Sequence, residues 1–375
     1  MSVIRDKQEL AGKLYDTVLF AGTFDRLHEG HIKVINKAIE LTERNLVICI
    51  TSDKFVAERK KILYELIEPY EKREEAIKNF FSNHKDSKRI SLECIVLNDI
   101  YGPIFEERIK LLLGSEETLD TCKAIQTKRF EKHGHTFDIF VVKLEPSKND
   151  FNIDKISSST KRIELLGTPK SDLKTKYDNK PLIISITGPI CSGKSELCKI
   201  IKELANDAYS PPSKLLQALS EHFGPMIINP DGYVDRAALR KIVFNNSQEL
   251  LYLTGLVVPI ALNRKESLIS ELKEKYPNNP VIFVENALVF KQEPLHEYDE
   301  VWCCICSPET SITRLESERG IKKDEALKIL SKNLSTKEFV DNSDVIFSNE
   351  FENSSIESQL DKSMSRLLTS LNWKE

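Results

Sequence analysis

Two separate strings of residues in this sequence suit the binding of nucleotide phosphates. The first reads GTFDRLHEGH, occupies residues 22–31 and follows an apolar segment. The second reads GPICSGKS, occupies residues 188–195 and matches the P-loop pattern GxxxxGKS/T. The first string suits nucleotidyl transfer and the second suits phosphoryl transfer, so we expect the chain to combine two chemistries.

The two histidines of the first string could act on a phosphate group. His28 and His31 are three positions apart at a predicted helix start, so both imidazoles can face the same phosphate chain. A pair of donors there would stabilise the charge that develops on the α-phosphate as pyrophosphate leaves. Gly22 would let the backbone approach a phosphate, and the amide groups of the helix start favour negative charge.

Two later groups of residues could complete this site. Lys60 or Lys61 could reach both the acceptor phosphate and the triphosphate, which would offset the repulsion between two anions. Ser157, Ser158 and Ser159 stand at another predicted helix start and could offer hydroxyls and amides to the β- and γ-phosphates. A solvated lysine pair and a simple helix cap are the competing interpretations.

The second string predicts an ATP site. Its backbone amides would cradle the phosphates, Lys194 would reach the β- and γ-phosphate oxygens, and the Ser195 hydroxyl would bind Mg²⁺. The residues predicted to form this phosphate-binding loop are Gly188, Ile190, Cys191, Ser192, Gly193, Lys194 and Ser195.

Alternating strand and helix patterns position both strings at the ends of buried strands. In the first half, the predicted strands are residues 17–21, 46–51, 92–97 and 137–142, and the predicted helices are 31–43, 68–83 and a stretch after Pro103. This alternation is typical of a doubly wound parallel sheet, which binds its ligand where a strand runs into a helix.

The second half repeats the alternation after a polar segment. Residues 167–180 lack hydrophobic periodicity and are predicted to form a linker between a domain of residues 1–166 and one of 181–375. The predicted elements that follow are strand 182–187, helix 195–205, several helices to about residue 275, strands 281–284 and 301–305, and a helix over 354–371. The pattern predicts a second α/β domain.

Composition narrows the class of protein. The chain has 375 residues, enough for two cores, and its net charge of −4 argues against nucleic acid as a partner. Its eight cysteines show no disulfide-scaffold spacing and are expected to be buried, reduced thiols. We found no signal peptide, presequence or membrane span, so a cytoplasmic location is expected. The oligomeric state stays open.

The first string and its surroundings resemble the HxGH nucleotidyltransferases, a Rossmann-like superfamily. The likeness is greatest to the eukaryotic and archaeal type of phosphopantetheine adenylyltransferase, and it extends over residues 60–73, 99–103, 115–118 and 156–162. It implies that 4′-phosphopantetheine contacts Thr23, Lys61, Arg73 and Tyr101. It also implies that ATP contacts Gly22, Thr23, Phe24, His28, His31 and the three serines. The expected catalytic residues are His28, His31, Lys60 and Lys61.

Two features of the sequence concern which nucleotide the first domain uses. After residues 115–118 the family has a Gly-Gly pair and an Asn, whereas this chain has Thr121-Cys122 and Gln126, which leaves the contacts to the adenylate open. Cytidylyltransferases are the rival within the superfamily. Their closing motif is RTxGIST, whereas this chain has ISSSTKR, which favours adenylyl transfer.

The second half resembles dephospho-CoA kinase, so the whole chain, over about residues 16–371, is similar to the family of bifunctional coenzyme A synthases. The matching strings are residues 231–244 and 281–288, and Arg314 in lid-like helices is expected to bind ATP. The implied activities are adenylyl transfer from ATP to 4′-phosphopantetheine, which gives dephospho-CoA, and then ATP-dependent phosphorylation of the ribose 3′-hydroxyl.

The kinase half departs from the family pattern. A strand with aspartates, reading VIDxDxL, is expected after the P-loop helix, but residues 202–209 read KELANDAY. Asp207 or Glu285 could supply the acid. Glu285 stands in place of an Asp and Ile329 in place of an Arg. Degeneration of the kinase site and a coding sequence that lacks a short exon both explain the difference.

Two other functions stay open at this point. The second domain could be a nucleotide-binding scaffold without kinase activity. The first domain could be a nucleotidyltransferase for another phosphorylated acceptor, such as phosphocholine.

Overall fold

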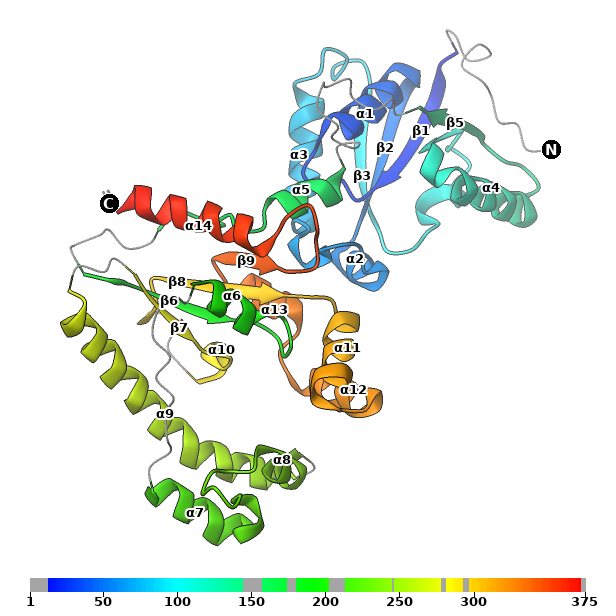
Figure 1. Cartoon of the computed structure of the whole chain (residues 1–375). Helices are drawn as coiled ribbons and strands as arrows, with labels where there is room; N and C mark the ends of the chain where they lie inside the picture. Colours follow the sequence, from blue (N-terminus) through cyan, green and yellow to red (C-terminus); the bar gives the residue numbers. More distant parts are fainter. Residues whose placement is uncertain are drawn as a thin grey trace. The chain divides into compact units, whose positions relative to one another are not determined.

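The chain forms two compact units in this computed structural model (Figure 1). The first unit contains Met1–Thr168 together with Leu334–Asp341 and Asn349–Gln359, and the rest of the chain belongs to the second unit. The structure describes residues 13–143, 157–173, 180–201, 213–244, 246–277, 281–292 and 297–371.

The first unit is built on a parallel sheet of five strands in the order β3-β2-β1-β4-β5. The strands are β1 (Tyr15–Gly22), β2 (Thr42–Thr51), β3 (Ser91–Leu97), β4 (Leu111–Ser115) and β5 (Asp138–Val142). The order of strands reverses between β1 and β4, and an open α/β sheet binds its ligand at the carboxyl ends of the strands beside such a point. The first sequence string begins at that place, because β1 ends at Gly22.

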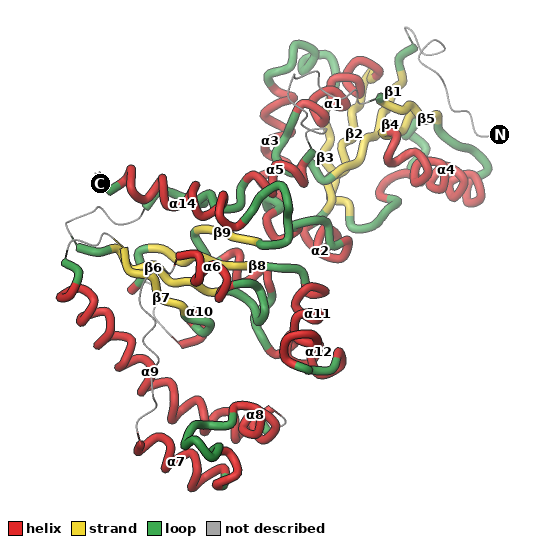
Figure 2. The backbone as a smooth tube through the Cα atoms, viewed as in Figure 1, coloured by secondary structure: helices red, strands yellow, loops and turns green. Residues whose placement is uncertain are grey.

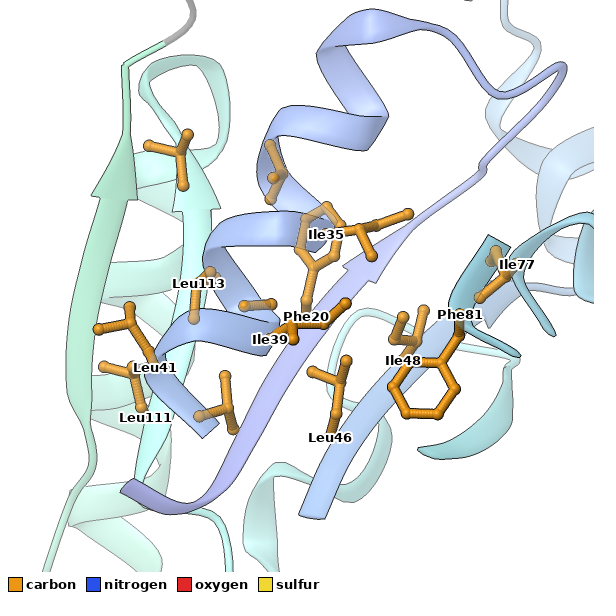
Figure 3. Packing of buried hydrophobic residues seen from close by; sticks show 14 of the residues in the cluster. Phe20, Ile35, Ile39, Leu41, Leu46, Ile48, Ile77, Phe81, Leu111 and Leu113 are labelled. Carbon is orange, nitrogen blue, oxygen red and sulfur yellow. The ribbon is translucent and has the colours of Figure 1, made fainter. Parts of the chain in front are cut away.

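Helices cover both faces of this sheet (Figure 2). They are α1 (Glu29–Leu41), α2 (Asp53–Arg59), α3 (Tyr70–Ser82), α4 (Leu119–His133) and α5 (Ser158–Glu164), with 3₁₀ helices η1 (Tyr64–Leu66), η2 (Gly102–Phe105) and η3 (Glu116–Thr118). Side chains alternate across a strand, so Phe20 packs under α1 and α3 (Figure 3), whereas Leu19 packs under α4. The fold class predicted for this half is confirmed.

One element of the first unit differs from the prediction. The helical stretch expected after Pro103 comprises the short η2 and the long α4, and between these two lies strand β4, which the sequence patterns did not reveal. The run LLLGS of β4 lacks β-branched residues and alternation. Its strand conformation comes from pairing with β1 and β5 on its two sides.

The second unit contains a parallel sheet of four described strands in the order β7-β6-β8-β9. The strands are β6 (Leu182–Thr187), β7 (Val281–Glu285), β8 (Glu300–Ile305) and β9 (Val345–Ser348). The short β9 was not expected from the sequence. Residues 202–212, where the aspartate-bearing strand was expected, lie outside the described part. The described strands form an uninterrupted sheet, because β6 pairs with both β7 and β8.

The helices of the second unit fall into two groups. A separate apolar cluster joins α7 (Ser213–Phe223), η4 (Pro225–Ile227), α8 (Arg236–Phe244) and the long α9 (Ser247–Lys275). The remaining helices of the second half are α6 (Lys194–Ile201), α10 (Val289–Gln292), α11 (Pro308–Arg319), α12 (Lys323–Lys332), α13 (Thr336–Asp341) and α14 (Ile356–Ser370). Of these, α13 belongs to the first unit and α14 contributes residues to both.

The segment expected to be a linker is partly bound to the second sheet. The amide of Lys170 donates to the carbonyl of Asp344 at 2.9 Å, and Pro169 forms a bridge with Val345. Residues 174–179 lie outside the described ranges. The division at residues 1–166 and 181–375 stays a prediction in its bounds, since two later segments group with the first unit.

Two further findings concern the chain as a whole. All eight cysteines are free thiols, and all but Cys94 and Cys191 are buried. No helix of the described residues has the length and apolar character needed to span a membrane.

Candidate active sites

The two histidines of the first string lie stacked at the carboxyl end of β1. Their ring centroids are 3.9 Å apart and their planes differ by 26°. His28 is the N-cap of α1, and His31 follows three residues later, so nearly one full turn of helix brings His31 onto the same face. The Nδ1 atoms of both rings are buried and have no hydrogen-bond partner among the described residues. The predicted pairing of the two imidazoles therefore has a geometric basis.

The surroundings keep both rings neutral. Burial, together with the neighbouring His28 and Lys61, lowers the pKa of His31 from 6.5 to about 3. Burial and the ammonium of Lys161 lower the pKa of His28. Each neutral ring keeps one N–H donor, and the tautomer decides which nitrogen carries it. The pair can thus donate hydrogen bonds to a phosphate without a charge of its own.

Two glycines make room for aromatic rings in this string. A Cβ on Gly30 would lie 3.1 Å from the Cε1 and Nδ1 atoms of His28. A Cβ on Gly22 would lie 3.0 Å from Cζ of Phe24. Contacts this short force the neighbouring ring to move, so these glycines set the position of the rings.

Phe24 occupies a different place from the one its predicted role suggests. Its side chain is fully buried, with ring centroids 5.2 Å from Phe20 and 5.5 Å from His31. Its backbone has a φ of 57°, and Arg26 has a φ of 50°, both in the left-handed region. Contact between Phe24 and ATP would therefore come from the backbone, and this role stays a prediction.

Lys61 reaches the first string. This agrees with the interpretation in which one lysine of the pair lies at the phosphate site. Its Nζ donates to Oγ1 of Thr23 at 2.7 Å. Although the Lys61 side chain is exposed, as that of Lys60 is, desolvation of its ammonium lowers its pKa, and Arg162 and Arg59 add to this effect. Lys60 is exposed and has a φ of 43° as the residue that ends α2. Of the two lysines, the structure places Lys61 beside the predicted substrate residue.

The three serines have three different partners. Ser157 caps α5 and accepts a bond from the amide of Thr160 at 3.2 Å. Ser158 donates to the carbonyl of Asp25 at 3.1 Å, and its Oγ lies 3.3 Å from Nε2 of His28. Ser159 accepts a bond from Arg162. Only Ser158 is thus in contact with the histidine pair.

Asp25 and Arg162 belong to this site, although neither was predicted as a site residue. They form a fully buried ion pair with Nη1 of Arg162 2.6 Å from Oδ2 of Asp25. Both lie inside strings that the sequence comparison singled out. Charged residues are rarely buried unless they are paired with an opposite charge. The opposite charges of these two residues were therefore a signal in the sequence for a buried ion pair.

Arg73 was predicted to contact substrate but is fully buried. Its Nη1 donates to the carbonyls of Thr23 and Thr51, both at 2.8 Å. Its Nε donates to Glu68 and its Nη2 to Asp53. In this arrangement Arg73 holds Thr23 in place, and a direct contact with substrate stays a prediction.

Tyr101 follows β3 and packs near η2. Its amide donates to Oδ1 of Asp99 at 2.7 Å, and its ring centroid is 5.8 Å from that of Phe105. The described contacts of its ring therefore lie with η2 rather than with the histidine pair, and its predicted role is untested.

The second string forms a tight loop between β6 and α6. A Cβ on Gly188 would lie 2.1 Å from the carbonyl oxygen of Cys304, and the φ of Gly188 is 143°. Gly193 has a φ of 98° and Cys191 one of 57°. Lys194 folds over this loop, since its Nζ donates to the carbonyls of Gly188 and Pro189 at 2.9 and 2.6 Å. Burial lowers the pKa of Lys194.

The loop also carries oxygen groups that suit a divalent cation. The hydroxyl of Ser195 donates to Oε1 of Glu285, the last residue of β7, at 3.4 Å. Oγ of Ser192 is buried and has no partner within the described ranges. Mg²⁺ binds proteins through one or two oxygen ligands together with substrate phosphates. The Ser195 and Glu285 oxygens fit that pattern, whereas Asp207 lies outside the described residues.

Helix α11 supports the loop from the other side. Arg314 donates from Nη1 to the carbonyl of Cys191 at 2.9 Å, and Ser311 donates to that of Ile190 at 3.1 Å. Ile329 is buried with Leu315 in an apolar cluster against which Ile190 packs. The position where an arginine was expected thus belongs to the core of this unit.

Comparison with known proteins gives matches to both halves. A family model described as Dephospho-CoA kinase matches residues 182–355, and one described as Cytidylyltransferase-like matches residues 19–184. A dephospho-CoA kinase of Carboxydothermus hydrogenoformans is 32% identical over 203 residues, which cover 52% of this chain and 96% of that protein.

One further relative and one solved structure also match part of this chain. A dephospho-CoA kinase of Synechocystis sp. is 27% identical over 199 residues, which cover 49% of this chain and 97% of that protein. The solved dephospho-CoA kinase from Campylobacter jejuni is 21% identical, with a TM-score of 0.34, and the match covers 51% of this chain and 98% of that one.

Proposed function

Because this chain belongs to the dephospho-CoA kinase family through residues 182–355, we propose that it catalyses two consecutive transfers in coenzyme A biosynthesis. The first unit transfers an adenylyl group from ATP to 4′-phosphopantetheine, which gives dephospho-CoA and pyrophosphate. The second unit phosphorylates the ribose 3′-hydroxyl of dephospho-CoA with a second ATP. The match of residues 19–184 to a cytidylyltransferase-like model supports nucleotidyl transfer by the first unit.

The observation that carries the first step is the neutral, stacked histidine pair beside Lys61 and Thr23. The acceptor phosphate attacks the α-phosphate of ATP, and the bond from that phosphorus to the bridging oxygen breaks. His28 and His31 donate hydrogen bonds to the oxygens on which charge develops. The Lys61 ammonium faces the incoming acceptor phosphate and offsets the repulsion between the two anions.

The second step relies on the P-loop. Lys194 gives up its two carbonyl partners and donates to the β- and γ-phosphates of ATP. Ser195 and Glu285 would hold Mg²⁺, and that ion would supply positive charge to offset the charge of the phosphates. Glu285 is also the described acid nearest to this loop in the hydrogen-bond network, so it can orient the ribose hydroxyl.

Product analysis separates the two activities. The protein is incubated with ATP, Mg²⁺ and 4′-phosphopantetheine, and pyrophosphate, dephospho-CoA and CoA are quantified by mass spectrometry. CoA is the expected final product. No dephospho-CoA above an enzyme-free control contradicts the first step, and accumulation of dephospho-CoA without CoA contradicts the second.

A nucleotide-binding scaffold is the alternative for the second unit, because residues 202–212 depart from the kinase pattern. Lys194→Ala distinguishes the two. A kinase loses CoA formation and retains dephospho-CoA formation, whereas a scaffold shows nucleotide binding that depends on Lys194 and an unchanged output of products.

Another nucleotide or acceptor is the alternative for the first unit, since the matching model is described as cytidylyltransferase-like. Pyrophosphate release is measured with ATP and CTP against 4′-phosphopantetheine and phosphocholine. Selectivity for ATP with 4′-phosphopantetheine supports our proposal, and selectivity for CTP or phosphocholine contradicts it.

A further inference from the structure

The guanidinium of Arg162 lies at the centre of the first site. Its side chain is 1% exposed, and each of its three nitrogens donates a hydrogen bond. Nε donates to the carbonyl of Ile62 at 2.8 Å, Nη1 to Asp25 at 2.6 Å, and Nη2 to Oγ of Ser159 at 3.1 Å. One side chain therefore joins three segments that are far apart in the sequence.

Asp25 completes this buried network. Its second carboxylate oxygen accepts bonds from Nη1 of Arg26 at 2.7 Å and from the amide of Glu68 at 3.1 Å. Its carbonyl accepts the bond from Ser158, whose Oγ also lies beside His28. The carboxylate thus has a partner on each oxygen, and its backbone is tied to the residue that contacts the histidine pair.

The network also fixes the loop that carries Lys61. Lys60 and Leu63 have φ values of 43° and 50°, so left-handed residues stand on both sides of residues 61–62. Such backbone persists only where surrounding contacts hold it. The bond from Arg162 to the carbonyl of Ile62 is such a contact, and it acts on the residue next to Lys61.

We propose that Arg162 is a positioning residue for the first transfer, which holds the Lys61 loop and the serines of α5 in register with the His28–His31 pair. The inference rests on the proposed adenylyl transfer. Arg162 itself contacts neither the acceptor nor ATP, because its three nitrogens are engaged and its side chain is buried.

A purely stabilising role does not require this arrangement. Apolar residues of similar volume often replace a buried ion pair without loss of stability, because burying two charges costs free energy. The rigid fork of a guanidinium does supply a fixed geometry to several acceptors at once, which a lysine cannot reproduce. We infer that the Asp25–Arg162 pair, although its burial costs free energy, serves to orient the groups that it joins.

The test compares two buried arginines of the first unit. Arg162→Lys keeps the charge but cannot make all three bonds. Arg129→Lys is the matched control, because Arg129 is also fully buried and donates to the carbonyls of Ile104 and Ile109, away from the histidine pair. We expect Arg162→Lys to lower kcat for pyrophosphate release about 10- to 100-fold, with a smaller change in KM for ATP. We expect Arg129→Lys to lower the melting temperature and to leave kcat within about twofold, because it does not displace the residues around the histidine pair.

A pH profile measures the effect of the Arg162 charge separately from the effect of its hydrogen-bond geometry. Lys61 faces the positive charges of Arg162, Arg59 and Arg73 and the negative charge of Asp25. Removing the charge in Arg162→Gln raises the pKa of Lys61, so the alkaline limb of the rate profile moves to higher pH. Arg162→Lys retains the charge and leaves that limb in place.

The outcomes distinguish this inference from the function on which it rests. If the unmodified protein releases no pyrophosphate with 4′-phosphopantetheine, the proposed function fails. If it does, and a folded Arg162→Lys variant retains its kcat, the positioning role is overturned. Should Arg162→Lys not fold, Asp25→Asn, which keeps the size of the side chain, decides the matter: an approximately tenfold or greater loss of kcat supports the role, and an unchanged kcat overturns it.

Discussion

At the scale of single residues, the first site depends on keeping two imidazoles uncharged next to a lysine. Burial dominates the pKa of both histidines, and the positive Lys61 and Lys161 act in the same direction. A cationic histidine would attract phosphate more strongly, but it would also repel Lys61. Neutral donors give directional hydrogen bonds without that repulsion, which suits the transfer between two anions that we propose for this site.

The protonation of His31 is a direct test of this balance. In the free protein we expect its imidazole to stay neutral down to about pH 5, because its pKa is lowered from 6.5 to about 3. The unfolded chain binds this proton near pH 6.5 and the folded chain does not. Folding is therefore weakened progressively as the pH falls from 6.5 towards 3. Imidazole chemical shifts from NMR report the titration, and a midpoint near 6.5 would contradict the account.

Gly30 offers a second test at this scale. In Gly30→Ala the new Cβ would meet the His28 ring at 3.1 Å, so the ring must shift by a few tenths of an ångström within the stacked pair. We expect pyrophosphate release to fall at least about tenfold, as misplaced catalytic groups commonly cost that much. Phosphorylation of added dephospho-CoA serves as the internal control and should not change. Equal loss of both activities would point to general misfolding.

At the scale of elements, both sites lie where a buried parallel strand ends and a helix begins. β1 leads to α1, and β6 leads to α6, so each loop presents backbone amides at the edge of a sheet. The two loops differ in what supports them. Side chains of α5 support the first, and α11 supports the second through Ser311 and Arg314.

The P-loop conformation makes a prediction about Gly188. A Cβ there would lie 2.1 Å from a backbone carbonyl of β8, which cannot move without disturbing the strand. We expect Gly188→Ala to abolish phosphorylation of dephospho-CoA. Gly320→Ala is the matched control, because Gly320 also has a positive φ of 62°, but a Cβ on it would meet no atom of the described residues within 4 Å. Kinase assays of both variants check this, and equal activity of the two would contradict it.

Much of this scaffold could be predicted from the sequence, because long apolar strands and amphipathic helices alternate regularly. Strands β4 and β9 escaped prediction for different reasons: LLLGS lacks β-branched residues, and VIFS contains strand formers but is only four residues long. The left-handed backbone at Phe24 and Lys60 could not be predicted either, because distant contacts hold it. The contacts of Arg73 with the carbonyls of Thr23 and Thr51 could not be predicted either, and its contact with substrate stays a prediction.

At the scale of the whole molecule, two segments that follow the P-loop in the sequence belong to the first unit, namely Leu334–Asp341 and Asn349–Gln359. The backbone passes between the units after residues 168, 333, 341, 348 and 359. Helix α13 contacts η1, which follows the Lys61 loop, and Gly167 lies so close to Gln359 that a Cβ would be 2.2 Å from its carbonyl. The first unit therefore uses residues encoded far beyond its own sheet.

This organisation predicts a remote effect on stability. Phe339 in α13 is buried, so Phe339→Ala should lower the free energy of unfolding of the first unit by about 3–5 kcal/mol. Ile329→Ala, in the buried cluster beside the P-loop, is the control and should weaken only the second unit. Hydrogen exchange of peptides from β1 and β2 measures the effect. Unchanged protection of those peptides in Phe339→Ala would show that α13 does not stabilise the first unit.

The central claim is that one chain carries out both transfers, and product formation from 4′-phosphopantetheine tests it most directly. The full-length protein is given ATP, Mg²⁺ and 4′-phosphopantetheine, and the products are followed over time by mass spectrometry. We predict that pyrophosphate and dephospho-CoA form first and that CoA then replaces dephospho-CoA. A reaction that yields no dephospho-CoA, or one in which dephospho-CoA accumulates and no CoA forms, would contradict this claim.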